Sequence, residues 1–218
     1  MKEFIITLSW LSPILLVLGL TLGLAKLTKL KRENRFILLF FLAELVIDLL
    51  SRYYRELSVA GNNLMFLQMN SLLELVFFSL FLHQFLNLKK KILTRILFVI
   101  IALIQIYQIL FVDTSTFYSF ELYGKFLTGL YIIVLCIMYF INLIKKDEIS
   151  EINPKLNLII VISIWALIDL FISLIVNYLI NGQLKYIMYF WVLRMFAYLM
   201  LYSHFILKIW KTGRVKRL

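Results

Sequence analysis

Five ionisable side chains lie inside long apolar stretches of the sequence: Glu44, Asp48, Glu74, Asp169 and Arg194. A charged group in the hydrocarbon of a membrane costs roughly 3 kcal/mol or more, so such groups face the protein interior and mark a binding site, a proton pathway or a contact between helices. Four acids and one arginine leave an excess of negative charge. We therefore expect a cation to neutralise them or some of the carboxyls to be protonated.

Polar side chains also follow helical spacing in two of these stretches. The first stripe comprises Glu44, Asp48, Arg52 and Arg55, and the second comprises Trp165, Asp169, Ser173 and Asn177. Spacings of three and four residues place each set on one face of a helix. Trp165 is deep enough to stack on a ligand or to cover a cation with its ring. We expect both stripes, together with Glu74 and Arg194, to line one cavity at the bilayer midplane that opens outward. The alternative is an interhelical lock, with Arg194 paired to Asp48 or Glu74 and the other acids bonded to Ser, Asn or Tyr side chains.

The two histidines, His83 and His204, lie at similar depth near the predicted inner ends of two spans. With Glu44 as a third ligand they could form a metal site. Two histidines on different helices near the headgroups are more typical of interfacial or gating side chains, and a gate is our expectation. The sequence shows no phosphate-binding glycine loop, nucleophile elbow, nucleic-acid motif or metal-ligand motif. We expect no metal and no cofactor.

The elements that must hold these residues are membrane spans. The chain has 218 residues, of which 63% are hydrophobic and 16% are charged, with a mean hydropathy of +0.93. A helix needs about 20 apolar residues to cross a membrane. The predicted fold is an all-α bundle of seven transmembrane helices that forms a single integral membrane domain over residues 1–218. The spans are expected at about 4–24, 36–52, 63–86, a fourth ending near 112, 125–144, 156–180 and 186–207. Gln105 and Gln108 of the fourth are expected to pack helices together.

The net charge of +11 reflects the orientation of the chain in the membrane rather than nucleic-acid binding, because the basic residues alternate with the spans. Of the 23 lysines and arginines, 17 lie in alternate connections, and one, Arg194, lies within a span. The opposite side holds five: Lys2, Arg52, Arg55, Lys125 and Lys185. The positive-inside rule then puts the amino terminus outside and the carboxyl terminus in the cytoplasm, and we expect the plasma (inner) membrane as the location.

An internal repeat is predicted from residue types that are rare in this chain. At an offset of 121 residues Asp48 matches Asp169, Gly61 matches Gly182 and His83 matches His204. The expected plan is a three-helix unit (1–90), a linker helix (91–116) and a second unit (117–218), both units in the same orientation.

This 3+1+3 plan resembles, over the whole chain and at the level of topology, the broad transporter, opsin and receptor group that includes the SWEET sugar carriers. The resemblance implies a site between two three-helix halves. Retinal proteins carry a lysine in the middle of the last helix, whereas Lys185 and Lys208 lie at its ends, so retinal is not expected.

Three functions fit these features. The first is a carrier, in an oligomer, that binds a small polar or cationic solute around Asp48, Glu74, Asp169 and Arg194 and rocks its halves. The second is a heptahelical sensor that acts through a separate membrane or cytoplasmic partner. The third is an intramembrane enzyme that modifies a lipid with paired carboxylates. We favour a function without enzymatic activity over an enzyme.

Overall fold

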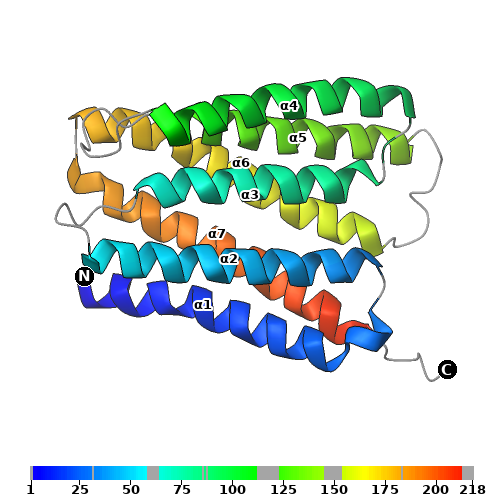
Figure 1. Cartoon of the computed structure of the whole chain (residues 1–218), viewed down its shortest axis with the longest axis horizontal. Coiled ribbons are helices and arrows are strands. Elements are labelled where there is room, and N and C mark those ends of the chain that lie inside the picture. Colours follow the sequence, from blue (N-terminus) through cyan, green and yellow to red (C-terminus); the bar gives the residue numbers. More distant parts are fainter. Residues whose placement is uncertain are drawn as a thin grey trace.

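The structure, a computed structural model, describes residues 2–30, 32–57, 64–84, 86, 88–111, 123–144, 154–182 and 184–212. These residues form seven α-helices and one short 3-10 helix, with no strand among them (Figure 1). The α-helices are α1 (Lys2–Ala25), α2 (Arg32–Leu57), α3 (Leu64–His83), α4 (Leu88–Phe111), α5 (Tyr123–Ile144), α6 (Pro154–Gly182) and α7 (Leu184–Lys211); η1 (Leu27–Lys29) lies between α1 and α2. The predicted all-helical class is confirmed. Gly61 and the boundary between residues 116 and 117 lie outside the described residues, as do the side chains of Asn177 and Lys185.

Six helices are long and apolar enough to cross a membrane, namely α1, α3, α4, α5, α6 and α7. This set is compatible with a multi-pass membrane protein. The predicted second span, α2, is not among the six, because Glu44, Asp48 and Arg52 interrupt its apolar sequence. Those three side chains line an internal cavity, so α2 carries its charges on an inner face while Leu39, Leu42 and other apolar side chains are exposed.

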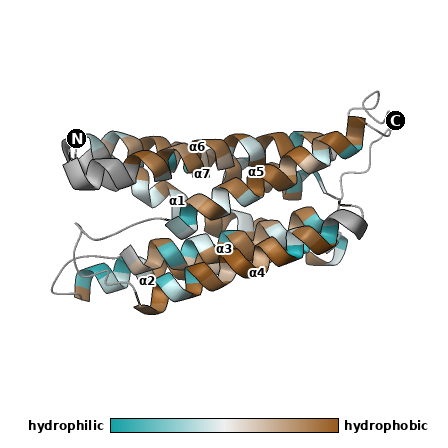
Figure 2. Ribbon diagram, turned by 90° about the horizontal axis from the view of Figure 1, so that it is seen from above, coloured by the Kyte–Doolittle hydropathy of each residue, from teal (hydrophilic) through white to brown (hydrophobic). Residues whose placement is uncertain are grey.

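The helices pack as a ring with one helix outside it. Neighbours in contact are α1 and α2, α2 and α3, α3 and α5, α5 and α6, α6 and α7, and α7 and α1. The remaining helix, α4, packs on α3 and α5. Seen from above, α2, α3 and α4 lie on one side and α5, α6 and α7 on the other, and hydrophobic residues make up much of the helical ribbon (Figure 2). We call the end of the bundle where α1 begins the amino end and the opposite end the carboxyl end.

Two glycines let α1 approach α2 closely. A Cβ atom on Gly19 would collide with the ring of Phe41, and one on Gly23 would collide with the side chain of Leu38. The two glycines are four residues apart and lie on one helical face, the spacing that small residues use where membrane helices touch. The close approach brings the amino half of α1 against the charged face of α2.

An aromatic cluster fills the carboxyl half of the ring. Phe40, Phe77, Phe78, Phe81 and Phe205 are buried, and the rings of Phe40 and Phe77 stack with centroids 4.3 Å apart. Ring pairs of this kind stabilise a core beyond the area they bury. The cluster fills the interior one helical turn away from Glu44 on α2 and from Glu74 on α3.

Candidate functional site

Four charged side chains from four helices meet in the interior. Lys125 of α5 places its Nζ 2.6 Å from Glu74 Oε2 of α3 and 3.2 Å from Asp169 Oδ2 of α6. Arg194 of α7 places its Nε 2.8 Å from Asp169 Oδ1. All four side chains are at most 5% exposed. With Tyr198 of α7 we call this group the ion-pair cluster.

Hydrogen bonds complete the ion-pair cluster around Glu74. Its Oε1 accepts a bond from the hydroxyl of Tyr198 and another from Asn70 Nδ2 at 3.0 Å. Lys125 Nζ also donates to the Tyr198 hydroxyl over 2.9 Å. Two acids and two bases make the cluster formally neutral, and a buried pair is tolerated when its remaining donors and acceptors are bonded. The cluster therefore joins α3, α5, α6 and α7 without an excess of formal charge.

Sequence alone places Lys125 at the start of the fifth span, among the basic residues of the outer side and not among the site residues. Its side chain is 1% exposed and lies in the first turn of α5, which begins at Tyr123. The shortage of positive charge among the intramembrane groups was the signal that could have found it, because a further cation was required. Arg194 pairs with Asp169 rather than with Asp48 or Glu74.

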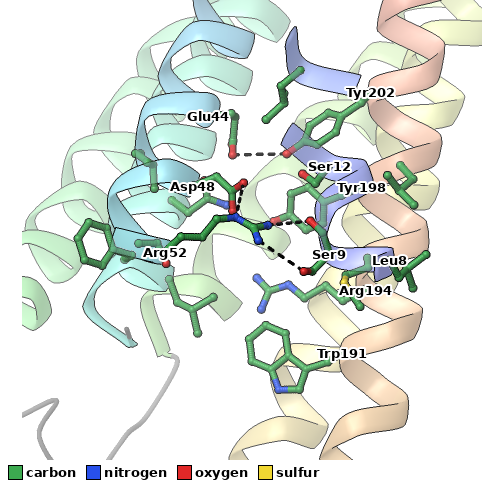
Figure 3. Close-up of a pocket in the computed structure, with 18 of the residues that line it drawn as sticks. Leu8, Ser9, Ser12, Glu44, Asp48, Arg52, Trp191, Arg194, Tyr198 and Tyr202 are labelled. Carbon is green, nitrogen blue, oxygen red and sulfur yellow. Dashed lines mark hydrogen bonds and ion pairs between the residues drawn. The ribbon is translucent and has the colours of Figure 1, made fainter. Parts of the chain in front are cut away.

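A cavity of about 420 Å³ lies beside the cluster, between α1, α2, α3 and α7 (Figure 3). Its lining residues lie in the amino halves of α1 and α3, the carboxyl half of α2 and the middle of α7, which places the cavity toward the amino end. The polar side chains that line it are Ser9, Ser12, Glu44, Asp48, Ser51, Arg52, Arg55, Asn70, Arg194, Tyr198 and Tyr202. The predicted stripe on α2 lines this cavity with all four of its members.

Within the cavity, Asp48 and Arg52 form an ion pair. Arg52 Nε donates to Asp48 Oδ2 over 3.1 Å, and Arg52 Nη2 donates to the carbonyl of Ser9 over 2.7 Å. The Arg52 guanidinium also lies 4.6 Å from the ring centroid of Trp10. The side chains of Asp48 and Arg52 are 28% and 17% exposed, respectively. This pair ties α2 to α1 and contributes no net charge.

Glu44 is the acid of the cavity wall for which the described residues supply no ion-pair partner. It is 4% exposed. Its Oε2 accepts one long hydrogen bond, 3.4 Å, from the hydroxyl of Tyr202. Its Oε1 has no hydrogen-bond partner among the described residues. A buried carboxylate with one weak bond is poorly stabilised, so this wall of the cavity favours a positively charged group.

Arg194 belongs both to the ion-pair cluster and to the cavity. While its Nε contacts Asp169, its guanidinium carbon lies 5.2 Å from the ring centroid of Trp191 and 5.8 Å from that of Tyr198. Figure 3 shows the guanidinium pointing into the cavity beside Trp191. Arg194 is thus the residue through which the cavity touches the cluster.

The acids that were expected to line one cavity are therefore divided between the cavity and the ion-pair cluster. Glu44, Asp48 and Arg194 line the cavity, whereas Glu74 and Asp169 do not line it and lie in the ion-pair cluster. Trp165 lines neither. Its buried ring packs against Phe78, with centroids 4.8 Å apart, and against Tyr198 at 5.5 Å.

The predicted gate residues occupy separate surroundings. His83 is half-buried and hydrogen-bonds through Nδ1 to Ser79 at 3.2 Å and through Nε2 to Thr94 at 2.7 Å. His204 is half-buried in the carboxyl half of α7. Within the described ranges, no three His, Cys, Asp or Glu side chains are grouped closely enough to hold a metal ion.

Comparison of the chain with models of known families found no match, and comparisons with curated proteins and with solved structures likewise found none. The resemblance to the 3+1+3 membrane proteins therefore remains one of helix order alone.

Proposed function

We propose that this chain is a membrane carrier that binds a small solute with a cationic group in the cavity between α1, α2, α3 and α7. Glu44 carries the proposal, because it is a buried acid on the cavity wall with an oxygen that has no partner among the described residues. A bound cation would offset the cost of burying that charge. The volume of about 420 Å³ is within the range of small-molecule sites.

Aromatic side chains on α7 support the binding of an organic cation. Trp191, Tyr198 and Tyr202 all line the cavity. Ring faces attract ammonium groups by about 2 kcal/mol or more where water is excluded. A solute cation at Glu44 would have an acid on one side and these rings on the other.

The helix boundaries support a carrier built from two equivalent halves. Adding 121 to the positions of Lys2, Arg32 and Leu64, where α1, α2 and α3 begin, gives 123, 153 and 185. The helices α5, α6 and α7 begin at positions 123, 154 and 184. The same shift relates α1 to α5 and α3 to α7. The contact of α1 with α7 therefore corresponds to the contact of α5 with α3, and both are present. In such proteins one half rocks against the other around a central site.

The proposed state is open to the outside and closed to the cytoplasm. The positive-inside rule assigns the amino end of the bundle, toward which the cavity lies, to the external side. The aromatic cluster lies on the other side of the cavity, with Phe40 one turn from Glu44 and Phe205 close to Tyr202 along their helices. Transport would require these rings to separate.

The closed inner half also favours a second candidate, a sensor that binds the same solute without moving it. At the carboxyl end Lys26 Nζ donates to the carbonyls of Trp210 at 2.5 Å and Thr212 at 3.1 Å, which ties the turn after α1 to the end of α7. Asn34 adds a bond to the Thr212 hydroxyl at 2.8 Å. A solute that shifted α7 would alter this tie on the predicted cytoplasmic face.

Binding and uptake of a simple amine test these proposals. Hexylamine should raise the melting temperature of the purified protein, since a ligand of the folded state stabilises it by RT ln(1 + [L]/Kd). The Glu44→Gln variant should lose this effect, and Glu56→Gln, an exposed acid on the same helix, should keep it. Uptake into proteoliposomes that depends on Glu44 supports the carrier, and binding without uptake supports the sensor. Equal binding by the wild type and Glu44→Gln would overturn both.

A further inference from the structure

The cavity contains a second charged anchor besides Glu44. The Nε of Arg194 is engaged by Asp169 at 2.8 Å. A guanidinium has five N–H donors, and its two terminal amino groups carry four of them. Arg194 also hydrogen-bonds to the Tyr198 hydroxyl, which leaves three of these four. Two parallel bonds from these groups match the two oxygens of a carboxylate. Trp191 and Tyr198 flank the guanidinium with their rings, and these rings limit its hydration.

The charges around the cavity balance without a net charge on the solute. Glu44, Asp48, Arg52, Arg55 and Arg194 line the cavity, which amounts to two negative and three positive charges. Asp169, the partner of Arg194, supplies a third negative charge. This sum includes Arg55, which lies at the exposed rim of the cavity. Among the buried groups of the described residues, Glu44 has no ion-pair partner, whereas Arg194 is paired with Asp169. A solute that carries one charge of each sign keeps the balance.

The two anchors are separated along α7. Tyr202, which bonds to Glu44, follows Arg194 by eight residues, which corresponds to a rise of about 12 Å along a helix. Figure 3 shows Glu44 and Arg194 at opposite ends of the drawn cavity, with the pair of Asp48 and Arg52 between them. An α-amino acid, whose two charges are attached to one carbon, cannot reach both anchors.

We infer that the solute is an elongated zwitterion, with an ammonium group at Glu44 and a carboxylate at Arg194. The class includes ω-amino acids and short peptides, since two or three extended residues span about 7–10 Å. This inference rests on the proposed function, because it places the cationic group of the solute at Glu44. It adds that a carboxylate at a fixed separation determines specificity.

Four six-carbon ligands test the inference on the wild-type full chain in lipid nanodiscs by titration calorimetry. They are 6-aminohexanoate, its isomer norleucine, hexylamine and hexanoate. A charge-assisted pair of hydrogen bonds contributes about 1.5–3 kcal/mol, so 6-aminohexanoate should bind at least about tenfold more tightly than each of the other three. Among ω-amino acids the affinity should reach a maximum at one chain length.

The Arg194→Lys variant assigns the carboxylate to its anchor. Lysine keeps a positive charge beside Asp169 and lacks the planar fork, so the advantage of 6-aminohexanoate over hexylamine should fall by at least about tenfold while hexylamine binding stays unchanged. Arg55→Lys, at the exposed rim of the cavity, is the matched control and should retain the advantage. If Arg194→Lys does not fold, the comparison of the four ligands on the wild type still decides whether the solute is an elongated zwitterion.

Two outcomes would overturn the inference. Hexylamine or norleucine could bind as tightly as 6-aminohexanoate, which would remove the elongated zwitterion and leave the amine-binding proposal intact. Alternatively, the advantage could survive in a folded Arg194→Lys protein, which would remove Arg194 as the anchor. Failure of the proposed function itself looks different, because then hexylamine binding would not depend on Glu44.

Discussion

The ammonium of Lys125 lies 2.6 Å from the carboxylate of Glu74, and each side chain is 1% exposed. The two residues are 51 positions apart and join α5 to α3, two helices of the ring that pack directly on one another. Asp169 and Arg194 extend this contact to α6 and α7. The ion-pair cluster therefore connects four of the seven helices at one point.

Removing Lys125 should destabilise the bundle strongly. The Lys125→Met variant leaves Glu74 and Asp169 without their shared cation, and breaking a buried ion pair on one side typically costs about 3–5 kcal/mol. The free energy of unfolding, measured by denaturant titration in mixed micelles, should fall by that amount. The double variant Lys125→Met, Glu74→Gln should recover much of the loss, because one buried negative charge is removed with its partner.

A surface lysine is the control for this experiment. Lys29 is exposed in η1, so Lys29→Met should change the stability by no more than about 0.5 kcal/mol. If Lys125→Met proves as stable as Lys29→Met, the ion-pair cluster does not hold the four helices together.

A methyl group at Gly19 should weaken the contact between α1 and α2. The new Cβ atom would overlap the ring of Phe41, which is fully buried against the rings of Tyr202 and Phe205 and has little space to move. Overpacking of this kind costs about 1–3 kcal/mol. Thermal unfolding of Gly19→Ala should show the loss, whereas Thr21→Ala, on the exposed side of the same turn, should behave like the wild type. Equal melting temperatures for the two variants would contradict the close packing.

Gln105 should contribute to the attachment of α4. Its Nε2 donates to Ser71 Oγ at 2.8 Å, to the carbonyl of Gly124 at 3.1 Å and to the hydroxyl of Thr128. Hydrogen bonds between membrane helices contribute roughly 0.6–1.7 kcal/mol by double-mutant cycles, and Gln105→Leu should lower the unfolding free energy by a similar amount. Gln84→Leu is the comparison, because the exposed Gln84 follows α3 and bonds to the Leu80 carbonyl of that same helix. A neutral Gln105→Leu would mean that α4 is held by apolar packing alone.

The predicted orientation can be tested with single cysteines at the two ends of α2. The native Cys136 is 1% exposed and should not react with a membrane-impermeant maleimide. In intact cells the reagent should label Glu56→Cys, at the end predicted to be external. It should label Lys29→Cys only after the membrane is permeabilised. The opposite pattern would reverse the orientation and place the cavity on the cytoplasmic side.

Local properties of the sequence determined the helical class and the spacing of the helices. Long apolar stretches can satisfy their backbone hydrogen bonds in a membrane only as helices or barrels, and the lengths here are those of helices. The face of α2 that carries Glu44, Asp48, Arg52 and Arg55 follows from helical periodicity alone, because residues three and four apart share a side. All four line the cavity. The repeat and the orientation stay predictions.

Only the tertiary structure decided which acids are paired with a base and which is not. Asp48 and Asp169 occupy the same position in the predicted repeat, yet one pairs with Arg52 on its own helix and the other with Lys125 and Arg194 from two further helices. Charge pairing depends on distances between helices that are remote in sequence, and neither hydropathy nor periodicity contains those distances. The same packing buried Lys125, closed Trp165 between aromatic rings, and left Glu44 facing the cavity with an oxygen that has no partner among the described residues.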